Sequence, residues 1–170
     1  MTQSVYITKT ASFLPNAPVD NDNMERILGQ PGARPSRARR TVLRSNGIKT
    51  RHYAIDPETL APTHSNASLA AEAVRRLDAD LSDVGVLASG TSIPDQIVPG
   101  HGVMVHGELG SPGLEVVSTS GVCISGAAAL KYAYFSVASG MHARAISTGS
   151  ELSSAVFGAK NYSAEVEAKV

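Results

Sequence analysis

A single cysteine stands where a strand pattern gives way to a long helix pattern, and its position predicts a nucleophilic thiol. Cys123 is the only cysteine of the 170-residue chain, and the small residues of Ser118–Val122 separate it from an apolar run. A helix N-terminus carries about half a positive charge and unpaired N–H groups, which favour a thiolate. The same N–H groups can stabilise the oxyanion that forms when a thiolate attacks a carbonyl. A lone cysteine is also commonly a small buried hydrophobic residue, and both interpretations stay open at this point.

Other cysteine chemistries fit the neighbouring residues less well. A phosphatase loop needs an arginine six residues after the cysteine, where this chain has Ala129. The segment Gly121–Gly126 resembles a hydrolase nucleophile elbow, but no aspartate follows it and His142 is the only later histidine. His101 and His106, five residues apart, do not share a helical face, so we expect no metal site.

The elements around the cysteine follow an alternating pattern of strands and helices. Helices are predicted from Asp20–Asn23 to Leu28, from Asn66 or Ser68 to Leu77, and from Ile124 to about Ser139, and strands at Val5–Thr8, Val84–Ser89, Leu114–Ser118 and Ala143–Ser147. Thr41–Leu43 leads into Ser45-Asn46-Gly47, which predicts a turn. The alternation favours an α/β fold with a mostly parallel sheet covered on both faces. No linker divides residues 1–170, which predicts one domain.

The composition is that of a globular protein. Hydrophobic residues make up 42% and charged residues 18% of the chain, and the formal net charge is +0, which excludes a disordered tail, a coiled coil and collagen. The N-terminus lacks a secretory signal, and Lys131 interrupts the most apolar stretch, Gly121–Gly140, so we expect no membrane span. One cysteine cannot form an internal disulfide, which favours a reducing compartment. We therefore expect a soluble, cytoplasmic protein.

The zero net charge conceals a basic segment, residues 34–51. It contains seven Lys and Arg side chains and no acid, which leaves the rest of the chain with a net charge of −7. Such a segment attracts anions, whether phosphate, nucleic acid or an acidic protein. Only Tyr53, beyond its end, supplies an aromatic ring, so we expect no nucleic-acid partner. A solvated loop is the alternative interpretation.

Five motifs, in this order along the chain, resemble the N-terminal half of a β-ketoacyl-acyl-carrier-protein synthase III, a condensing enzyme of the thiolase superfamily. They are Tyr6-Ile7 with Phe13-Leu14-Pro15, the segment Asn46–His52, the strand Val84–Ser92, Cys123 at its helix start, and Ile146–Glu151. The stretch Pro35–Arg40, with Leu43–Ile48 and Tyr53–Asp56, resembles the branch that forms dialkylresorcinols. The resemblance implies a thiolase-like fold of α/β/α/β/α layers made of two similar halves, of which residues 1–170 are the N-terminal one.

The resemblance also implies the chemistry. Cys123 would take an acyl group from coenzyme A or a carrier protein, with its own backbone N–H as one oxyanion donor. A carbanion from a second thioester would then attack the acyl-cysteine in a Claisen condensation, as in fatty-acid, polyketide or alkylresorcinol biosynthesis. No cofactor is implied beyond substrates carried as coenzyme A or phosphopantetheine thioesters. The alternatives are an acyltransferase or cysteine hydrolase that forms no carbon–carbon bond, and a non-catalytic partner subunit.

The family's substrate-contacting positions map onto this sequence in part. The arginine that contacts coenzyme A corresponds to Ser45, or to Arg44 with one residue of slippage, and Thr41 replaces the family's tryptophan. Because tight coenzyme A binding is then in doubt, carrier-borne substrates are favoured, and we expect Arg39 and Arg40 to dock an acidic acyl carrier protein. Val98 matches the position that closes the acyl tunnel of a partner subunit, so the resemblance implies a homodimer.

The family's catalytic His and Asn belong to its C-terminal half, and no residue of this sequence matches them. We therefore expect that half as a separate chain or a missing segment. The helix after Cys123 is apolar or small nearly all round, which predicts burial. In this chain by itself, one face of that helix would lack its counterpart helix and lie exposed.

Overall fold

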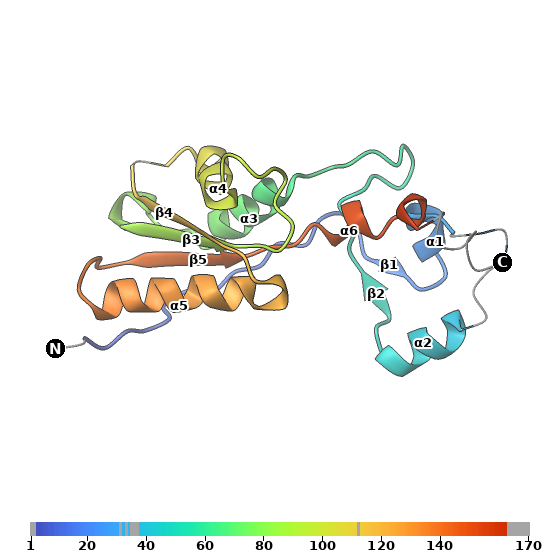
Figure 1. Ribbon diagram of the computed structural model, residues 1–170, viewed down its shortest axis with the longest axis horizontal. Helices are drawn as coiled ribbons and strands as arrows, with labels where there is room; N and C mark the ends of the chain where they lie inside the picture. The colour runs from blue at the N-terminus through green and yellow to red at the C-terminus, as the bar shows by residue number, and fades with distance from the viewer. Residues whose placement is uncertain (1–2, 31, 33, 35–37, 112, 163–170) are drawn as a thin grey trace. The chain divides into compact units, whose positions relative to one another are not determined.

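The computed structural model describes residues 3–30, 32, 34, 38–111 and 113–162, which belong to two compact units (Figure 1). The first unit comprises the N-terminal residues up to Phe13 together with Ser65–Glu151. The second comprises Leu14–His64 together with the residues from Leu152 onward. Cys123 thus belongs to the first unit and the basic segment to the second.

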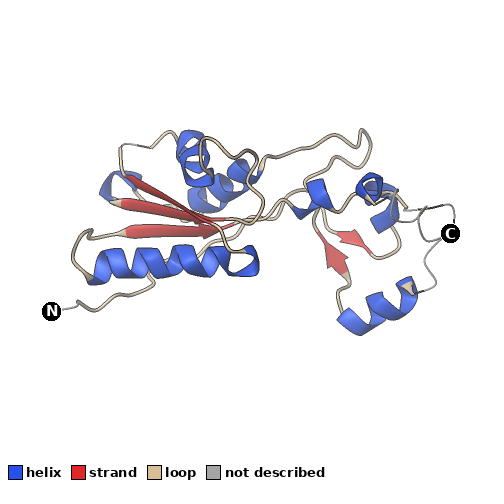
Figure 2. Cartoon of the chain, viewed as in Figure 1, coloured by secondary structure: helices blue, strands red, loops and turns tan. Residues whose placement is uncertain are grey.

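A three-stranded parallel sheet forms the centre of the first unit (Figure 2). Strand β3 (Val86–Gly90) lies between β4 (Glu115–Thr119) and β5 (Ala145–Gly149), and every residue of β3 is buried. The register pairs the last residue of β3 with the last residues of β4 and β5, so the three strands end together at one edge. The strands that the sequence predicts in these places are confirmed, each displaced by one or two residues.

Helices cover both faces of this sheet, as the alternating pattern predicts. Helices α3 (Asn66–Arg75) and α4 (His101–Leu109) lie on one face, and α5 (Ser125–Ala138) lies on the other (Figure 1). The core of the first unit is built from small and branched side chains, namely Ala67, Ala70, Ala71, Val74, Val84, Leu87, Val105 and Ile146. Burial of this apolar surface is the main favourable contribution to the stability of the unit.

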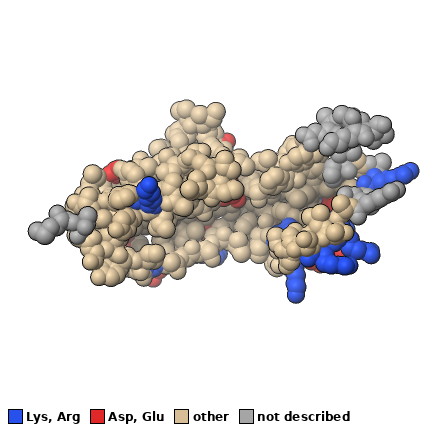
Figure 3. Space-filling model, turned by 60° about the horizontal axis from the view of Figure 1, so that its bottom comes forward, with Lys and Arg blue, Asp and Glu red and all other residues tan. Residues whose placement is uncertain are grey.

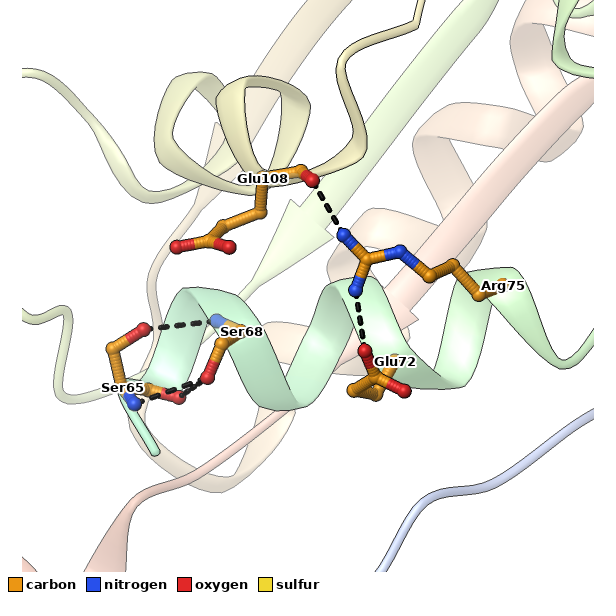
Figure 4. Close-up of polar contacts among 5 residues, drawn as sticks. All are labelled: Ser65, Ser68, Glu72, Arg75 and Glu108. Carbon is orange, nitrogen blue, oxygen red and sulfur yellow. Dashed lines mark hydrogen bonds and ion pairs between the residues drawn. The ribbon is translucent and has the colours of Figure 1, made fainter. Parts of the chain in front are cut away.

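Helix α3 begins with a capping box. The Ser65 Oγ accepts the Ser68 N–H at 3.0 Å, and the Ser65 N–H donates to the Ser68 Oγ at 3.0 Å (Figure 4). At the other end of the helix, Arg75 pairs with Glu72 and donates to the Glu108 carbonyl oxygen of α4 at 2.5 Å. The predicted helix is confirmed, although its last two predicted residues lie beyond its end.

Helix α4 is not expected from the sequence. Two glycines inside it, Gly102 and Gly107, each lower helix propensity by about 1 kcal/mol relative to alanine. Contact with the sheet explains the first of them, because a Cβ at Gly102 would lie 2.9 Å from the Val116 Cγ1 of β4. The helix therefore depends on packing against the sheet rather than on local preference.

Helix α5 is buried on one side only. Ala129 and Ala133 are buried, whereas Leu130, Tyr134 and Phe135 are 48%, 50% and 56% exposed. The expectation of a helix buried nearly all round is wrong for this chain, because a single sheet covers only one face of it. The exposed apolar face that we expect without a counterpart helix is confirmed.

The N-terminal segment does not form the predicted strand. Within the described residues Val5–Thr8 has no strand assignment, and Tyr6 and Ile7 are exposed. The Gln3 N–H, just before this segment, donates to the Ala138 carbonyl oxygen at 3.1 Å. A β-rich sequence becomes a strand only where a neighbouring strand accepts and donates its backbone hydrogen bonds.

The second unit consists of short elements. Two two-residue strands, β1 (Val19–Asp20) and β2 (Thr50–Arg51), pair antiparallel, and the helices of this unit are α1 (Met24–Leu28), α2 (Arg39–Asn46) and α6 (Ser153–Val156). Helix α1 confirms the predicted helix. Gly47, with a φ of 68°, ends α2, so the predicted turn is confirmed as a helix end. Residues 39–46 form a helix and not the loop of the alternative interpretation, but none of them is buried, so a solvated segment is not contradicted. Short 3₁₀ turns lie at Leu81–Asp83, Val122–Ile124 and Ala159–Asn161.

Candidate active site around Cys123

Cys123 lies in a single 3₁₀ turn between the end of β4 and the start of α5. Its predicted place at the beginning of a long helix is therefore confirmed. The side chain is exposed, so the alternative of a buried hydrophobic cysteine does not hold in this chain. Its role as a nucleophile stays a prediction.

Hydroxyl side chains shape this turn. The Ser125 Oγ accepts the Gly121 N–H at 3.0 Å and donates to the Val122 carbonyl oxygen at 2.7 Å. The Thr119 Oγ1, at the end of β4, donates to the Ser125 carbonyl oxygen at 2.8 Å. These short side chains satisfy polar backbone groups of the turn.

Glycines bring the start of α5 onto the sheet. A Cβ at Gly90, the last residue of β3, would lie 2.2 Å from the Ser125 carbonyl oxygen. A Cβ at Gly126 would lie 3.2 Å from the Gly149 Cα, at the end of β5. Cys123 is therefore held at the carboxyl ends of the parallel strands, where α/β sheets bind their ligands.

The backbone N–H groups of the turn are the candidate oxyanion donors. The Ile124 N–H donates to the Gly121 carbonyl oxygen at 3.2 Å, and the Ser125 N–H donates to the Val122 carbonyl oxygen. Both donors are therefore engaged in closing the turn. The role of oxyanion donor falls to the N–H of Cys123, as the resemblance implies, and stays a prediction.

A polar cluster around the buried His101 lies at the same edge of the sheet. His101, at the start of α4, is only 3% exposed, and its Nε2 lies 3.1 Å from the Ser150 Oγ just beyond β5. Burial lowers the pKa of His101, and the carboxylates of Asp95 and Glu151 act in the opposite direction. The sequence predicts no metal ligation by His101 and does not predict this cluster. The signal for it is that Ser150 and Glu151 directly follow a predicted strand.

The loop after β3 contains the predicted site residue Val98 and the carboxylate of Asp95. Val98 is 81% exposed, next to a cis peptide bond with Pro99, and its contact with a partner subunit stays a prediction. Asp95 accepts the N–H groups of Asn66 and Ala67 at 2.7 and 2.8 Å. This carboxylate thus ties the loop to the start of α3, where a negative charge is favourable.

Helix α2 carries the four remaining predicted site residues. Arg40, Arg44 and Ser45 are exposed. The Arg39 Nε lies 3.2 Å from the Glu25 Oε1, and its guanidinium also donates to the Asn21 carbonyl oxygen. Arg39 therefore has partners inside the second unit, whereas Arg40 and Arg44, four residues apart, lie on one face of the helix. Figure 3 shows Lys and Arg side chains gathered on this unit.

A shallow hollow of about 460 Å³ lies between α3 and α4, lined by Asp95, Met104 and Glu108 among others. Cys123 is not among its lining residues. Within the described part of the chain, no three His, Cys, Asp or Glu side chains are grouped to hold a metal ion. No helix in that part is both long and apolar enough to cross a membrane.

Comparison with curated proteins finds relatives of the kind that the sequence motifs suggest. The chain is 27% identical over 153 residues to β-ketoacyl-[acyl-carrier-protein] synthase III from Xanthomonas oryzae pv. oryzae and, equally, to that from Xanthomonas axonopodis pv. citri. The chain resembles β-ketoacyl-[acyl-carrier-protein] synthase III. The matched region covers 89% of this chain and 44% of each synthase III, so the chain spans about half the length of these relatives. No family model matches the sequence.

Solved structures show the same fold. The tetronic acid condensing enzyme AbyA1 has a TM-score of 0.69 and 24% identity, with 87% of this chain and 46% of AbyA1 covered. The synthase III of Thermus thermophilus has a TM-score of 0.68 and 23% identity, with 88% and 44% covered. The fold of this chain is therefore that of half of a thiolase-type condensing enzyme. Membership of the dialkylresorcinol branch stays a prediction, and part of its motif, residues 35–37, lies outside the described residues.

Proposed function

We propose that this chain supplies the nucleophile of a condensing enzyme, with Cys123 as the acyl-accepting residue. The observation that carries the proposal is the exposed thiol on a tight turn at the carboxyl ends of β3 and β5, in a chain that resembles synthase III. The thiolate attacks the carbonyl of an acyl thioester, the carbon–sulfur bond of the donor breaks, and coenzyme A or a carrier thiol leaves. An acyl-cysteine remains.

The second step forms the carbon–carbon bond. A second thioester loses CO₂ from a malonyl group, or a proton from its α carbon, and becomes a carbanion. The carbanion attacks the carbonyl of the acyl-cysteine, the carbon–sulfur bond to Cys123 breaks, and the Cys123 thiolate leaves and takes up a proton. The resemblance implies that the His and Asn that assist this step belong to the C-terminal half of the family's enzymes. We therefore propose that the C-terminal half, on the same or a second polypeptide, is needed for condensation, and that the assembled enzyme is a homodimer.

The proposed substrates are acyl groups carried by an acidic carrier protein. Arg40 and Arg44 are exposed on one face of α2, in a segment without acidic side chains. Phosphopantetheine carries a phosphate, and a carrier protein adds further negative charge, so both would be attracted to this face. Arg39, which the sequence also suggests, would act by holding α2 through Glu25.

The proposal is tested by weighing the protein after incubation with an acyl-coenzyme A and with an acyl carrier protein. The wild-type chain should gain the mass of the acyl group, and Cys123→Ala should not. Because Cys123 is exposed, this substitution should leave the midpoint of thermal unfolding unchanged within about 2 °C. Acylation of the Cys123→Ala variant would exclude Cys123 as the acceptor.

Product analysis then separates the condensing enzyme from the alternatives. With the C-terminal half and an acceptor thioester present, the acyl-cysteine should be consumed with formation of a β-ketoacyl product. Release of free acid alone would indicate a hydrolase, and transfer without a new carbon–carbon bond would indicate a simple acyltransferase. A wild-type chain that is never acylated would indicate a non-catalytic subunit.

A further inference from the structure

The residue before Cys123 has an unusual backbone conformation. Val122 has a φ of 53°, in the left-handed region that β-branched residues rarely adopt. Its side chain is 71% exposed, so packing of that side chain does not hold the conformation. Strained residues persist only where surrounding contacts over-determine them, and they cluster at functional sites. Contacts of the Val122 backbone must therefore maintain this turn.

Inside the turn, the Ser125 Oγ donates to the Val122 carbonyl oxygen. From outside the turn, one side chain contacts the same oxygen directly, and a second side chain holds the first. The Ser92 Oγ, on the loop after β3, donates to the Val122 carbonyl oxygen at 2.8 Å. The Ser92 N–H in turn donates to the Glu151 Oε1 at 2.6 Å, a short hydrogen bond to a carboxylate. Ser92 and Glu151 each lie two residues beyond a strand end, at Gly90 and Gly149. A continuous connection thus runs from the end of β5 through Ser92 to the peptide before Cys123.

The Val122 carbonyl and the Cys123 N–H belong to the same planar peptide unit. A hydrogen bond that fixes the carbonyl oxygen therefore also fixes the direction of the N–H, which points the opposite way within the same plane. Hydrogen bonding at the oxygen also polarises the amide, which makes its N–H a stronger donor. This N–H is the oxyanion donor that the resemblance to synthase III implies.

We propose that Ser92 and Glu151 are positioning residues, which orient the Cys123 N–H toward the oxyanion through the Val122–Cys123 peptide. The proposal rests on the proposed function for its catalytic consequence, although the orientation of the peptide can be measured independently. Ser92 acts directly on the carbonyl oxygen. Glu151 acts on Ser92, by holding the backbone from which its side chain extends.

The first experiment measures the geometry without any reaction. Because Cys123 is the only cysteine, labelling with [¹⁵N]cysteine yields a single amide resonance in the 170-residue chain. Ser92→Ala and Glu151→Ala should both move this resonance, and Ser92→Thr, which keeps the hydroxyl, should leave it nearer the wild-type position. Ser139→Ala, which removes a serine hydroxyl from the far end of α5, is the control. An unchanged Cys123 resonance in Ser92→Ala would overturn the proposal.

The second experiment compares two reactions of the same thiol. Alkylation by iodoacetamide needs the thiolate but forms no oxyanion, whereas acylation by an acyl-coenzyme A needs both. Ser92→Ala should therefore lower the acylation rate about tenfold or more, and change the alkylation rate at each pH less than twofold. Glu151→Ala should also lower the acylation rate, to a smaller extent. Glu151→Gln should retain most of the acylation rate because it keeps an acceptor oxygen. Ser92→Thr, which keeps the hydroxyl, should acylate at close to the wild-type rate.

The outcomes separate this proposal from the proposed function. Equal losses in both reactions would indicate general disruption of the turn and would overturn the positioning role. A wild-type chain that is alkylated but never acylated would refute the proposed function, and the amide resonance would still decide whether Ser92 and Glu151 orient the peptide.

Discussion

At the scale of single residues, the close approach between α5 and the sheet depends on Gly90. We predict that Gly90→Ala destabilises the protein by about 1–3 kcal/mol, because the added methyl group would lie 2.2 Å from the Ser125 carbonyl oxygen. Denaturant unfolding measures this loss. Gly107→Ala is the matched control, since its Cβ would contact nothing within 4 Å, and it should stabilise by about 0.5–1 kcal/mol. A Gly90→Ala variant as stable as the wild type would show that the start of α5 can move away from β3.

His101 gives a prediction about pH. Burial lowers its pKa in the folded protein, whereas in the unfolded chain it binds a proton near pH 6.5. Below that pH the unfolded state therefore holds more protons, so the contribution of His101 to stability is present above pH 6.5 and is lost as the pH falls toward the folded pKa. The free energy of unfolding should fall less between pH 7.5 and 5.5 in His101→Gln than in the wild type. His106→Gln, on the same helix, is the control, and an unaltered slope in His101→Gln would contradict the prediction.

At the scale of elements, α2 provides the surface that we propose for carrier docking. Arg40→Glu combined with Arg44→Glu should raise the apparent KM for acylation by acyl carrier protein about tenfold, and should change the KM for a small acyl thioester little. The difference should shrink at high salt, because the Debye length is only about 3 Å at 1 M. Lys131→Glu combined with Arg144→Glu, at two exposed basic residues of the first unit, makes the same change in net charge and is the control. Equal effects on both substrates would argue against docking at α2.

At the scale of the whole molecule, the exposed apolar face of α5 is the surface that we expect a partner to cover. We predict that the 170-residue chain self-associates when purified by itself, because Leu130, Tyr134 and Phe135 present a contiguous apolar surface. Replacing Leu130 with Gln and Tyr134 with Lys should lower the apparent mass in light scattering and weaken binding of the C-terminal half. Tyr6→Lys, which changes an aromatic residue that is 78% exposed in the N-terminal segment, should do neither. A monomeric wild-type chain would contradict this prediction.

Packing in the whole molecule explains which strands could be predicted from the sequence. The runs that form β3, β4 and β5 alternate with helix patterns, and each is followed by small or polar residues that end it. Strand β3 is buried throughout, whereas β4 and β5 are partly buried. The run Val5–Thr8 has equal β propensity, yet in the described residues it has no strand beside it. Strand propensity reflects packing against neighbours more than backbone preference. The sequence alone therefore did not separate the runs that form strands from the run Val5–Thr8, which does not.

The sequence by itself determined the alternation of strands and helices, the position of Cys123 at a helix start and the basic character of residues 34–51. These features depend on local composition and short spacing, which a single chain shows directly. Only the tertiary structure decided that α4 is a helix, that Val5–Thr8 is not a strand, and that Arg39 is held by Glu25. Only the tertiary structure brings Ser92, Glu151 and the Val122 carbonyl together. The reason is that these contacts join residues 30 to 59 positions apart, and only the parallel register of β3, β4 and β5 places their ends at one edge.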